Sequence, residues 1–238
     1  MAGNYAVLVD TGFLMAEGAK ALGLSRKGLA FDGAACVAWF NRFRHDRRYA
    51  RTARLFGPRS FLRAYWYDAA HDPSDRRFET QRRTFDELAE VPGLYLRLGY
   101  LQELRPGWQR PVRKAVQACD VSMIDFEKHF TFRPELTQKG VDALMTLDLV
   151  NLSRDRVVDA VLLISGDRDL EEAVRVAQGV GCKIALAHPP GAGVATTLRH
   201  LADARLQIEP ADLRRMLVPI QSSPPPLAVL AVRSAQTP

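Results

Sequence analysis

Apolar positions along this chain fall into two alternating patterns. Short apolar or aromatic runs bounded by turn residues are typical of buried strands, and we expect strands at 5–10, 59–68, 94–101, 160–165, 183–187 and, at an edge, 204–208. Between these runs, helical spacing and end signals predict helices at 11–22, 32–54, 73–90, 137–153, 170–179 and 196–204. This alternation predicts an α/β domain with a mainly parallel sheet of five or six strands.

The two most continuous apolar runs are both followed by acids. Asp10 closes the first run, and Asp167 and Asp169 follow the run at 160–165. Counting the strands along the chain, we expect the order 3-2-1-4-5, which places strands one and four side by side. Open α/β sheets bind ligands at such a switch point, beyond the carboxyl ends of the strands. Asp142, in the first turn of the preceding helix, can point into the same cleft.

Four carboxylates in one cleft would repel one another, by roughly 1 to 4 kcal/mol for each close pair. The neighbouring sequence offers too few Lys or Arg residues to neutralise them. A divalent cation would solve this, and carboxylate oxygens suit Mg²⁺ or Mn²⁺. A structural alternative exists for the second turn, because Asp169 and Glu172 fit a capping box at the start of a helix.

Three motifs together resemble those of NYN domains, which are PIN-like metal-dependent ribonucleases that include the bacterial LabA-like group. The motifs are Val9-Asp10, KGVD at 139–142 and SGDRDL at 165–170, and the resemblance covers roughly residues 4–210. Many family members carry Asp-x-x-Asn at the first strand, but here the fourth position is Phe13. An amide that orients a ligand or faces a phosphate would then be missing.

The resemblance implies a PIN-like three-layer α/β/α sandwich and hydrolysis of RNA phosphodiester bonds that leaves a 5′ phosphate. The residues expected to hold one or two Mg²⁺ or Mn²⁺ ions, and so to carry catalysis, are Asp10, Asp142, Asp167 and Asp169. A bound cation would lower the pKa of a water molecule and stabilise the leaving oxygen. The expected partner is RNA, single-stranded rather than structured, and a homodimer is left open.

Asp148 lies six residues after Asp142 on the same predicted helix. At about 100° and 1.5 Å per residue, the two side chains point about 120° apart with roughly 9 Å of rise between them. We therefore expect Asp148 to be a buried structural acid, hydrogen-bonded near the turn at Ser165, and not a cation ligand. Ser165 and Asp68 are expected to support the site around Asp10, although a loop or cap role fits Asp68 equally well.

Basic residues supply candidate RNA contacts. Lys139 and Arg168 adjoin the acids and could neutralise the scissile phosphate. A denser positive run on the helix predicted at 32–54 could follow an RNA backbone, with interleaved aromatic residues to stack a base; the contacts chosen there are Arg44, Arg47, Arg48 and Arg51. The alternative is a solvated arginine face over core aromatic residues.

The 238 residues fit one domain, which we place at 4–217, followed by a Pro-rich disordered tail at 218–238. The net charge of +6 suits an anionic polymer, although an Arg-rich solvated surface would also explain it. Cys36, Cys119 and Cys182 show neither paired nor metal-type spacing, which fits a cytoplasmic protein. No apolar run approaches the ~20 residues of a membrane span, and no leader-like segment precedes the first strand, so we expect it to begin the mature fold.

Several other functions are disfavoured by missing motifs. The chain has no GxxxxGK[ST] phosphate loop, no GxGxxG dinucleotide fingerprint and no GxSxG nucleophile turn. A haloacid-dehalogenase-like phosphatase would need a second acid two residues after the first-strand Asp, where this chain has Gly12. A catalytically silent RNA-binding or scaffold domain stays open, and a requirement for a divalent metal would separate it from a nuclease.

Overall fold

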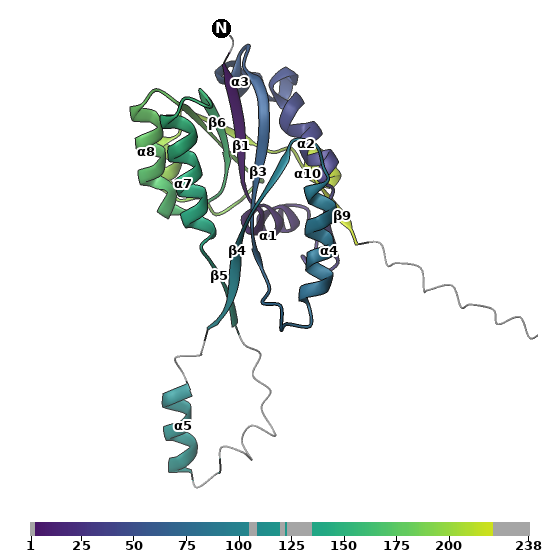
Figure 1. Ribbon diagram of the computed structural model, residues 1–238, viewed down its shortest axis with the longest axis vertical. Helices are drawn as coiled ribbons and strands as arrows, with labels where there is room; N and C mark the ends of the chain where they lie inside the picture. The colour runs from purple at the N-terminus through teal and green to yellow at the C-terminus, as the bar shows by residue number, and fades with distance from the viewer. Residues whose placement is uncertain (1–2, 105–108, 120–121, 123–134, 221–238) are drawn as a thin grey trace, which may run out of the picture.

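The computed structural model describes residues 3–104, 109–119, 122 and 135–220, and a seven-stranded sheet forms its centre (Figure 1). The strand order is β5-β4-β3-β1-β6-β7-β8, and β2 and β9 form a separate two-stranded sheet. All pairs in the large sheet are parallel except β4 with β5. The strand bounds are β1 Asn4–Asp10, β2 Leu29–Phe31, β3 Ser60–Ala70, β4 Leu94–Leu104, β5 Glu135–Lys139, β6 Ala160–Ile164, β7 Lys183–His188, β8 Ala204–Gln207 and β9 Leu217–Pro219.

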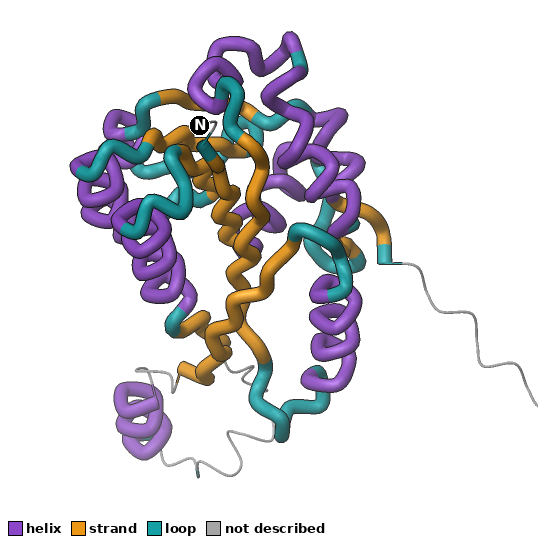
Figure 2. Tube along the Cα trace, turned by 45° about the horizontal axis from the view of Figure 1, so that its top comes forward, coloured by secondary structure: helices purple, strands orange, loops and turns teal. Residues whose placement is uncertain are grey.

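Helices cover both faces of the sheet and complete the expected three-layer α/β/α sandwich. One face carries α7 and α8, and the other carries α1, α2, α4 and α10 (Figures 1 and 2). The helix bounds are α1 Thr11–Ala21, α2 Gly33–Arg42, α3 Ala50–Phe56, α4 Phe78–Ala89, α5 Gln109–Ala118, α7 Val141–Arg154, α8 Glu171–Gly179, α9 Thr196–Leu201 and α10 Pro210–Met216, with 3₁₀ turns η1 Phe43–His45, η2 Arg47–Tyr49 and η3 Arg168–Leu170. No helix in the described part of the chain is long and apolar enough to cross a membrane.

The two central strands are buried on both faces, which explains their unbroken apolar sequences. In β1, Tyr5, Val7 and Val9 belong to the core under α1 and α2, whereas Ala6 and Leu8 belong to the core under α7 and α8. The strand β6 lies beside it, and every one of its residues is fully buried. The most deeply buried part of the sheet is therefore its centre, and Asp10, the first candidate acid, lies at the end of one of these central strands.

The predicted strand order is confirmed for the five main strands, as β4-β3-β1-β6-β7, and the expected edge strand β8 follows β7. The strand β5 was not expected, because the residues from 137 onwards were predicted to begin a helix. They form a strand since β4 extends to Leu104 and offers a partner edge, with pairs from Leu104–Glu135 to Tyr100–Lys139. The polar sequence ELTQK does not carry the apolar pattern of a core strand.

The single helix expected over 32–54 is also wrong, because the chain breaks at Asp46. This residue has extended backbone, with φ −86° and ψ 125°, and its carboxylate accepts a hydrogen bond from the Arg48 N–H at 2.9 Å. Such a turn, in which a side chain replaces a backbone partner, competes with helix continuation. Two short 3₁₀ turns therefore separate α2 from α3 and redirect the arginines that follow.

The strand β4 continues past its predicted end at residue 101 to Leu104, and α5 begins at Gln109, in a stretch whose Pro and Gly residues are typical of a loop. Some predictions lie outside the described residues. These are a substrate-facing loop, which Pro106, Gly107 and Trp108 favour, a surface or core role for His129 and Phe132, and the Pro-rich tail beyond residue 220.

The end of the described chain is fixed to the α2 side of the molecule. The buried Asp212 of α10 accepts a hydrogen bond from the Tyr49 hydroxyl at 2.7 Å, and the Arg48 guanidinium lies 3.0 Å from the same oxygen. Next along the chain, β9 pairs with β2. Regular structure therefore continues slightly past the domain boundary predicted at residue 217.

Candidate active site

Asp10 sits at the carboxyl end of β1, and both of its oxygens have partners. One oxygen accepts a hydrogen bond from the Phe13 N–H at 2.9 Å and so caps α1. The other lies 3.4 Å from the Ser165 hydroxyl, which donates to it. Because β1 and β6 are paired up to Val9–Ile164, Asp10 and Ser165 leave the sheet side by side.

The turn after β6 positions the next two acids. The buried Ser165 hydroxyl accepts a hydrogen bond from the Asp167 N–H at 3.2 Å. The Asp167 carboxylate in turn accepts one from the Asp169 N–H at 2.9 Å and caps η3. The cap is therefore Asp167, and not Asp169 paired with Glu172 as the capping-box alternative supposed.

The fourth acid arrives from the unexpected strand. Gly140 alone separates β5 from α7, so Asp142 lies in the first turn of α7 directly after the β4–β5 pairing. A Cβ on Gly99 of β4 would lie 2.3 Å from the Lys139 carbonyl oxygen, so a glycine is needed at this crossing. Close backbone packing thus carries the KGVD segment to the acidic end of the sheet.

The four carboxylates interact electrostatically. Burial, together with the charges of Asp142 and Asp167, raises the pKa of Asp10 to about 6, against the opposing effect of the hydrogen bonds from Phe13 and Ser165. Burial also raises the pKa of Asp142, with added repulsion from Asp167 and Asp169. Within the described residues, no Lys, Arg or His nitrogen lies within 4 Å of any of these four carboxylates.

The donor type suits a hard divalent cation, since all four candidate ligands are carboxylates. The carboxylates lie further apart than the ligands of a metal site, because no three His, Cys, Asp or Glu side chains in the described ranges are grouped closely enough to hold a metal ion. The mutual repulsion seen in the pKa values extends over longer distances than coordination does. The acids are therefore close enough to repel one another but do not form a preassembled coordination shell.

Phe13, the residue that departs from the family pattern, packs over the Ser-Gly-Asp turn. A Cβ on Gly166 would lie 2.6 Å from the Phe13 ring and 2.4 Å from the Gly193 carbonyl oxygen. The ring therefore requires the glycine of this turn.

The sequence did not predict that Gln138 of β5 lies near Asp10. A Cβ on Gly12 would lie 3.3 Å from the Gln138 amide nitrogen and 3.4 Å from Asp10 Oδ1.

Asp148 is the half-buried structural acid that helix geometry predicted, but its partners differ from the expected ones. It accepts two hydrogen bonds from the Arg97 guanidinium, at 2.7 and 2.9 Å, and one from the Tyr67 hydroxyl at 2.9 Å. Its hydrogen-bond partners therefore come from β3 and β4, and not from the turn at Ser165 as expected. Asp68 accepts from the Ala69 N–H at 2.7 Å, and burial raises its pKa while His71 opposes the rise.

The two basic residues expected beside the acids are exposed. Lys139 is the last residue of β5, three positions before Asp142. Arg168 follows Asp167 directly, and its guanidinium lies 3.4 Å from Glu171. His188, at the end of β7, contacts the Pro189 carbonyl through Nδ1 at 2.9 Å.

The structure places the arginine run away from the acids. The chain leaves α3 and enters β3 at Ser60, which pairs with Asn4 at the opposite end of β1 from Asp10. Arg44 donates to the Arg59 carbonyl and lies over the Tyr5 ring, and Arg48 is paired with Asp46 and Asp212. The aromatic residues considered for base stacking are buried in the core and are Trp39, Phe43 and Tyr49.

Comparison with known proteins places the chain in a family. The protein y4oD of Sinorhizobium fredii, itself uncharacterised, is 33% identical over 101 residues, which are 42% of this chain and 47% of that protein. The chain thus matches about half the length of that relative. The crystal structure of VPA0982 from Vibrio parahaemolyticus, a protein of unknown function, aligns with a TM-score of 0.49 and 20% identity, covering 91% of this chain and 97% of that one. The NYN domain family matches residues 32–209, so the chain belongs to the NYN domain family of the PIN-like nuclease superfamily.

Proposed function

We propose that this protein is a metal-dependent ribonuclease that hydrolyses RNA phosphodiester bonds with Mg²⁺ or Mn²⁺. One observation carries the proposal: carboxylates from β1, α7 and the turn after β6 lie near one another, so that burial and the neighbouring acids raise the pKa of Asp10 and of Asp142, and no cationic side chain in the described part of the chain neutralises them. Membership of a nuclease superfamily is consistent with it. The three cysteines are free, and we place the protein in the cytoplasm as part of this proposal.

The residues that would hold the cation are Asp10, Asp142, Asp167 and Asp169. Bound there, a divalent cation would supply an activated water molecule and charge stabilisation for the leaving oxygen. Ser165 holds Asp10 and the Asp167 backbone in place through its hydroxyl. Lys139 and Arg168 are exposed at the rim of the acids, where their charges favour a phosphate.

A catalytically silent RNA-binding domain is the second candidate. Two observations favour it: the absence of a three-ligand cluster among the described residues, and Phe13 where many relatives have an amide. Both candidates bind RNA, but only the nuclease needs the cation for turnover.

Cleavage of a labelled single-stranded RNA, with Mn²⁺ or Mg²⁺ and with excess EDTA, separates the two. We expect cleavage with metal, none in EDTA, and a loss of more than about 100-fold in Asp142→Asn, because a candidate cation ligand is removed. The matched control is Asp155→Asn, an exposed acid that follows the same helix, which should retain full activity.

Cleavage that persists undiminished in EDTA would contradict the metal mechanism. RNA binding without cleavage under any divalent metal would instead establish the silent domain.

A further inference from the structure

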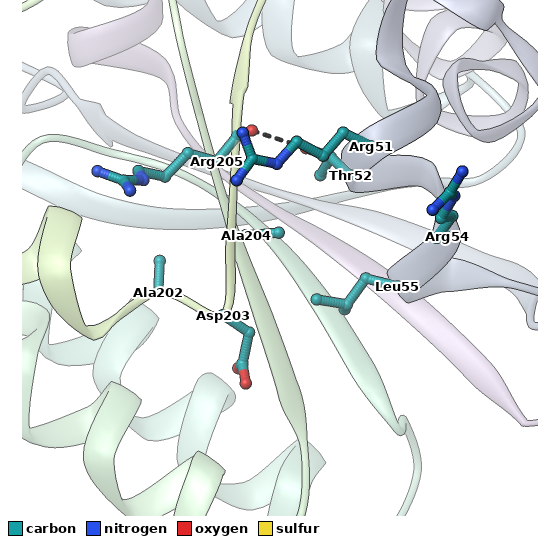
Figure 3. Close-up of a pocket in the computed structure, with 8 residues that line it drawn as sticks. All are labelled: Arg51, Thr52, Arg54, Leu55, Ala202, Asp203, Ala204 and Arg205. Atoms are coloured by element: carbon teal, nitrogen blue, oxygen red, sulfur yellow. Dashed lines mark hydrogen bonds between the residues drawn. The ribbon is translucent and has the colours of Figure 1, made fainter.

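A basic cavity lies between α3 and β8, away from the acids (Figure 3). Its volume is about 570 Å³, and it is lined on one side by α3 and on the other by β8 and the residues just before it. The Thr52 hydroxyl donates to the Arg205 carbonyl at 2.6 Å and joins the two walls. Three arginines line this cavity: Arg51, Arg54 and Arg205.

Among the described residues, these three arginines have no acidic partner. In the described part of the chain, no carboxylate oxygen lies within 4 Å of their guanidinium nitrogens, and all three residues are exposed. The cavity's one acid, Asp203, is already engaged: it accepts from the Ile184 N–H and the Gln178 amide, both at 2.9 Å, and lies 3.4 Å from Lys183. The cavity therefore carries an uncompensated positive charge.

The positive surface continues past the cavity. Arg54 also lines a neighbouring hollow of about 330 Å³, together with Arg47 and with Asp46, whose carboxylate is paired with Arg48. Arg47 is exposed and likewise has no carboxylate within 4 Å among the described residues. We call Arg47, Arg51, Arg54 and Arg205 the α3 basic surface. Clustered arginines that are not paired with carboxylates are typical of sites for phosphate groups, which the guanidinium fork binds through paired hydrogen bonds.

Strand register separates the α3 basic surface from the acids. Arg205 pairs with Leu186, whose neighbour Leu163 pairs with Leu8 of β1. Arg205 is thus three strands aside from Asp10 and two residues short of it, or roughly 14 Å across and 7 Å along the sheet. The arginines of α3 lie further off, near the amino ends of the strands. One phosphate cannot contact both places, so a ligand of both must be a chain.

We propose that the α3 basic surface binds the phosphate backbone of an RNA at a site separate from the acids. The inference rests on the proposed function for the choice of RNA as the polyanion. It replaces two of the arginines first expected, Arg44 and Arg48, which are occupied within the fold, by Arg54 and Arg205. An RNA bound at the α3 basic surface would stay bound whether or not another part of the same RNA is being cleaved at the acids.

Binding measured without catalysis tests this. Fluorescence anisotropy of a labelled single-stranded RNA of about 16 nucleotides, in EDTA and over a range of salt, gives Kd and its salt dependence. Compared with the wild type, the triple variant Arg51→Gln/Arg54→Gln/Arg205→Gln should bind at least about tenfold more weakly. Its log–log salt slope should be shallower by about 2, because three contacts to single-stranded RNA are removed.

The matched control removes the same charge elsewhere: Arg83→Gln/Arg175→Gln/Arg214→Gln, three exposed arginines on α4, α8 and α10. This control should lose little affinity and keep its slope. Equal losses in both triple variants would overturn the site and leave only general attraction. Should the cavity variant unfold, Arg205→Gln alone must still flatten the slope by about 0.7.

Competitors distinguish the ligand. Polyglutamate that displaces the RNA as well as an unlabelled RNA does would overturn phosphate recognition. A thermal shift with inorganic phosphate alone that is lost in the cavity variant would point to a small free phosphate ligand and overturn the RNA assignment. Failure of the nuclease proposal, seen as no cleavage with metal, would leave the binding results unaffected.

Discussion

Asp10 has two roles that make opposite demands on one carboxylate. As the cap of α1 it benefits from its charge, which the Phe13 N–H stabilises. As a buried group close to other acids it is penalised for its charge, and the net result is a pKa raised to about 6. A carboxyl group whose folded pKa lies above its unfolded value destabilises the folded state once it is ionised.

Asp10→Asn should therefore stabilise the metal-free protein at pH 7, by roughly 1 to 3 kcal/mol, since Asn still caps α1. The folded pKa of about 6 exceeds the ordinary 3.8, so the penalty of the charged form is fully present above pH 6. It fades as the pH falls through 6 and is gone below about 4. Urea denaturation of both proteins in EDTA at several pH values measures this difference, and a less stable Asp10→Asn at pH 7 would contradict the repulsion.

Asp148 should matter for stability more than for chemistry. Asp148→Ala removes the acceptor shared by Arg97 and Tyr67 and should lower the free energy of unfolding by about 1 to 3 kcal/mol, with cleavage kept in the folded fraction. Combining it with Tyr67→Phe should cost less than the sum of the two single changes, because both variants break one network. A stable but inactive Asp148→Ala would instead place Asp148 among the reacting groups.

Residue roles were predictable where one element decides them. Helix geometry alone predicts that the side chains of Asp142 and Asp148 point in different directions. The apolar run of a buried strand predicts that Asp10 lies at the end of that strand. The partners of Asp148 were not predictable, since Arg97 lies 51 residues away and reaches it only through the strand order. Gln138 was not predicted as a neighbour of Asp10, because its segment was predicted to be a helix, in which the side chain would point in a different direction than it does in a strand.

At the scale of elements, the β4–β5 pairing positions the KGVD segment. Gly99→Ala should lower stability by about 1 to 3 kcal/mol and reduce cleavage, because its Cβ would press on the Lys139 carbonyl and move the start of α7. The control is Gly179→Ala at the end of α8, where a Cβ meets nothing within 4 Å. That change should be neutral or slightly stabilising. Thermal melts of both variants measure the contrast, and equal effects would mean that the crossing is not tight.

Elements within the core were predictable from apolar runs, and elements outside it were not. The strand β5 is polar and owes its conformation to the edge of β4. The break at Asp46 contains neither Gly nor Pro, and the Asp46 carboxylate accepts hydrogen bonds there from the backbone and the guanidinium of Arg48. Both misreadings arise where local hydrogen bonding or a distant partner, and not burial, decides the backbone.

For the whole molecule, net charge indicates an anionic partner but not where it binds. The +6 charge is distributed unevenly: acids gather at the carboxyl ends of β1 and β6, and unpaired arginines gather at α3 and β8. Sequence order suggested one continuous arginine path, but the turn at Asp46 and the locking of Arg48 to Asp212 divide it. Separated charges of opposite sign can orient a polyanion before contact, through long-range steering.

The single-residue link between β5 and α7 has a mechanical consequence. Gly140 joins α7, and with it Asp142, to the β4–β5 pair, which extends past the end of α7 (Figure 1), so this acid moves with that pair of strands. A slip of one residue between β4 and β5 would pull the start of α7 by about 3.4 Å and turn every side chain of β5 to the other face. The position of Asp142 relative to the other three acids is thus set by the register of the β4–β5 pair.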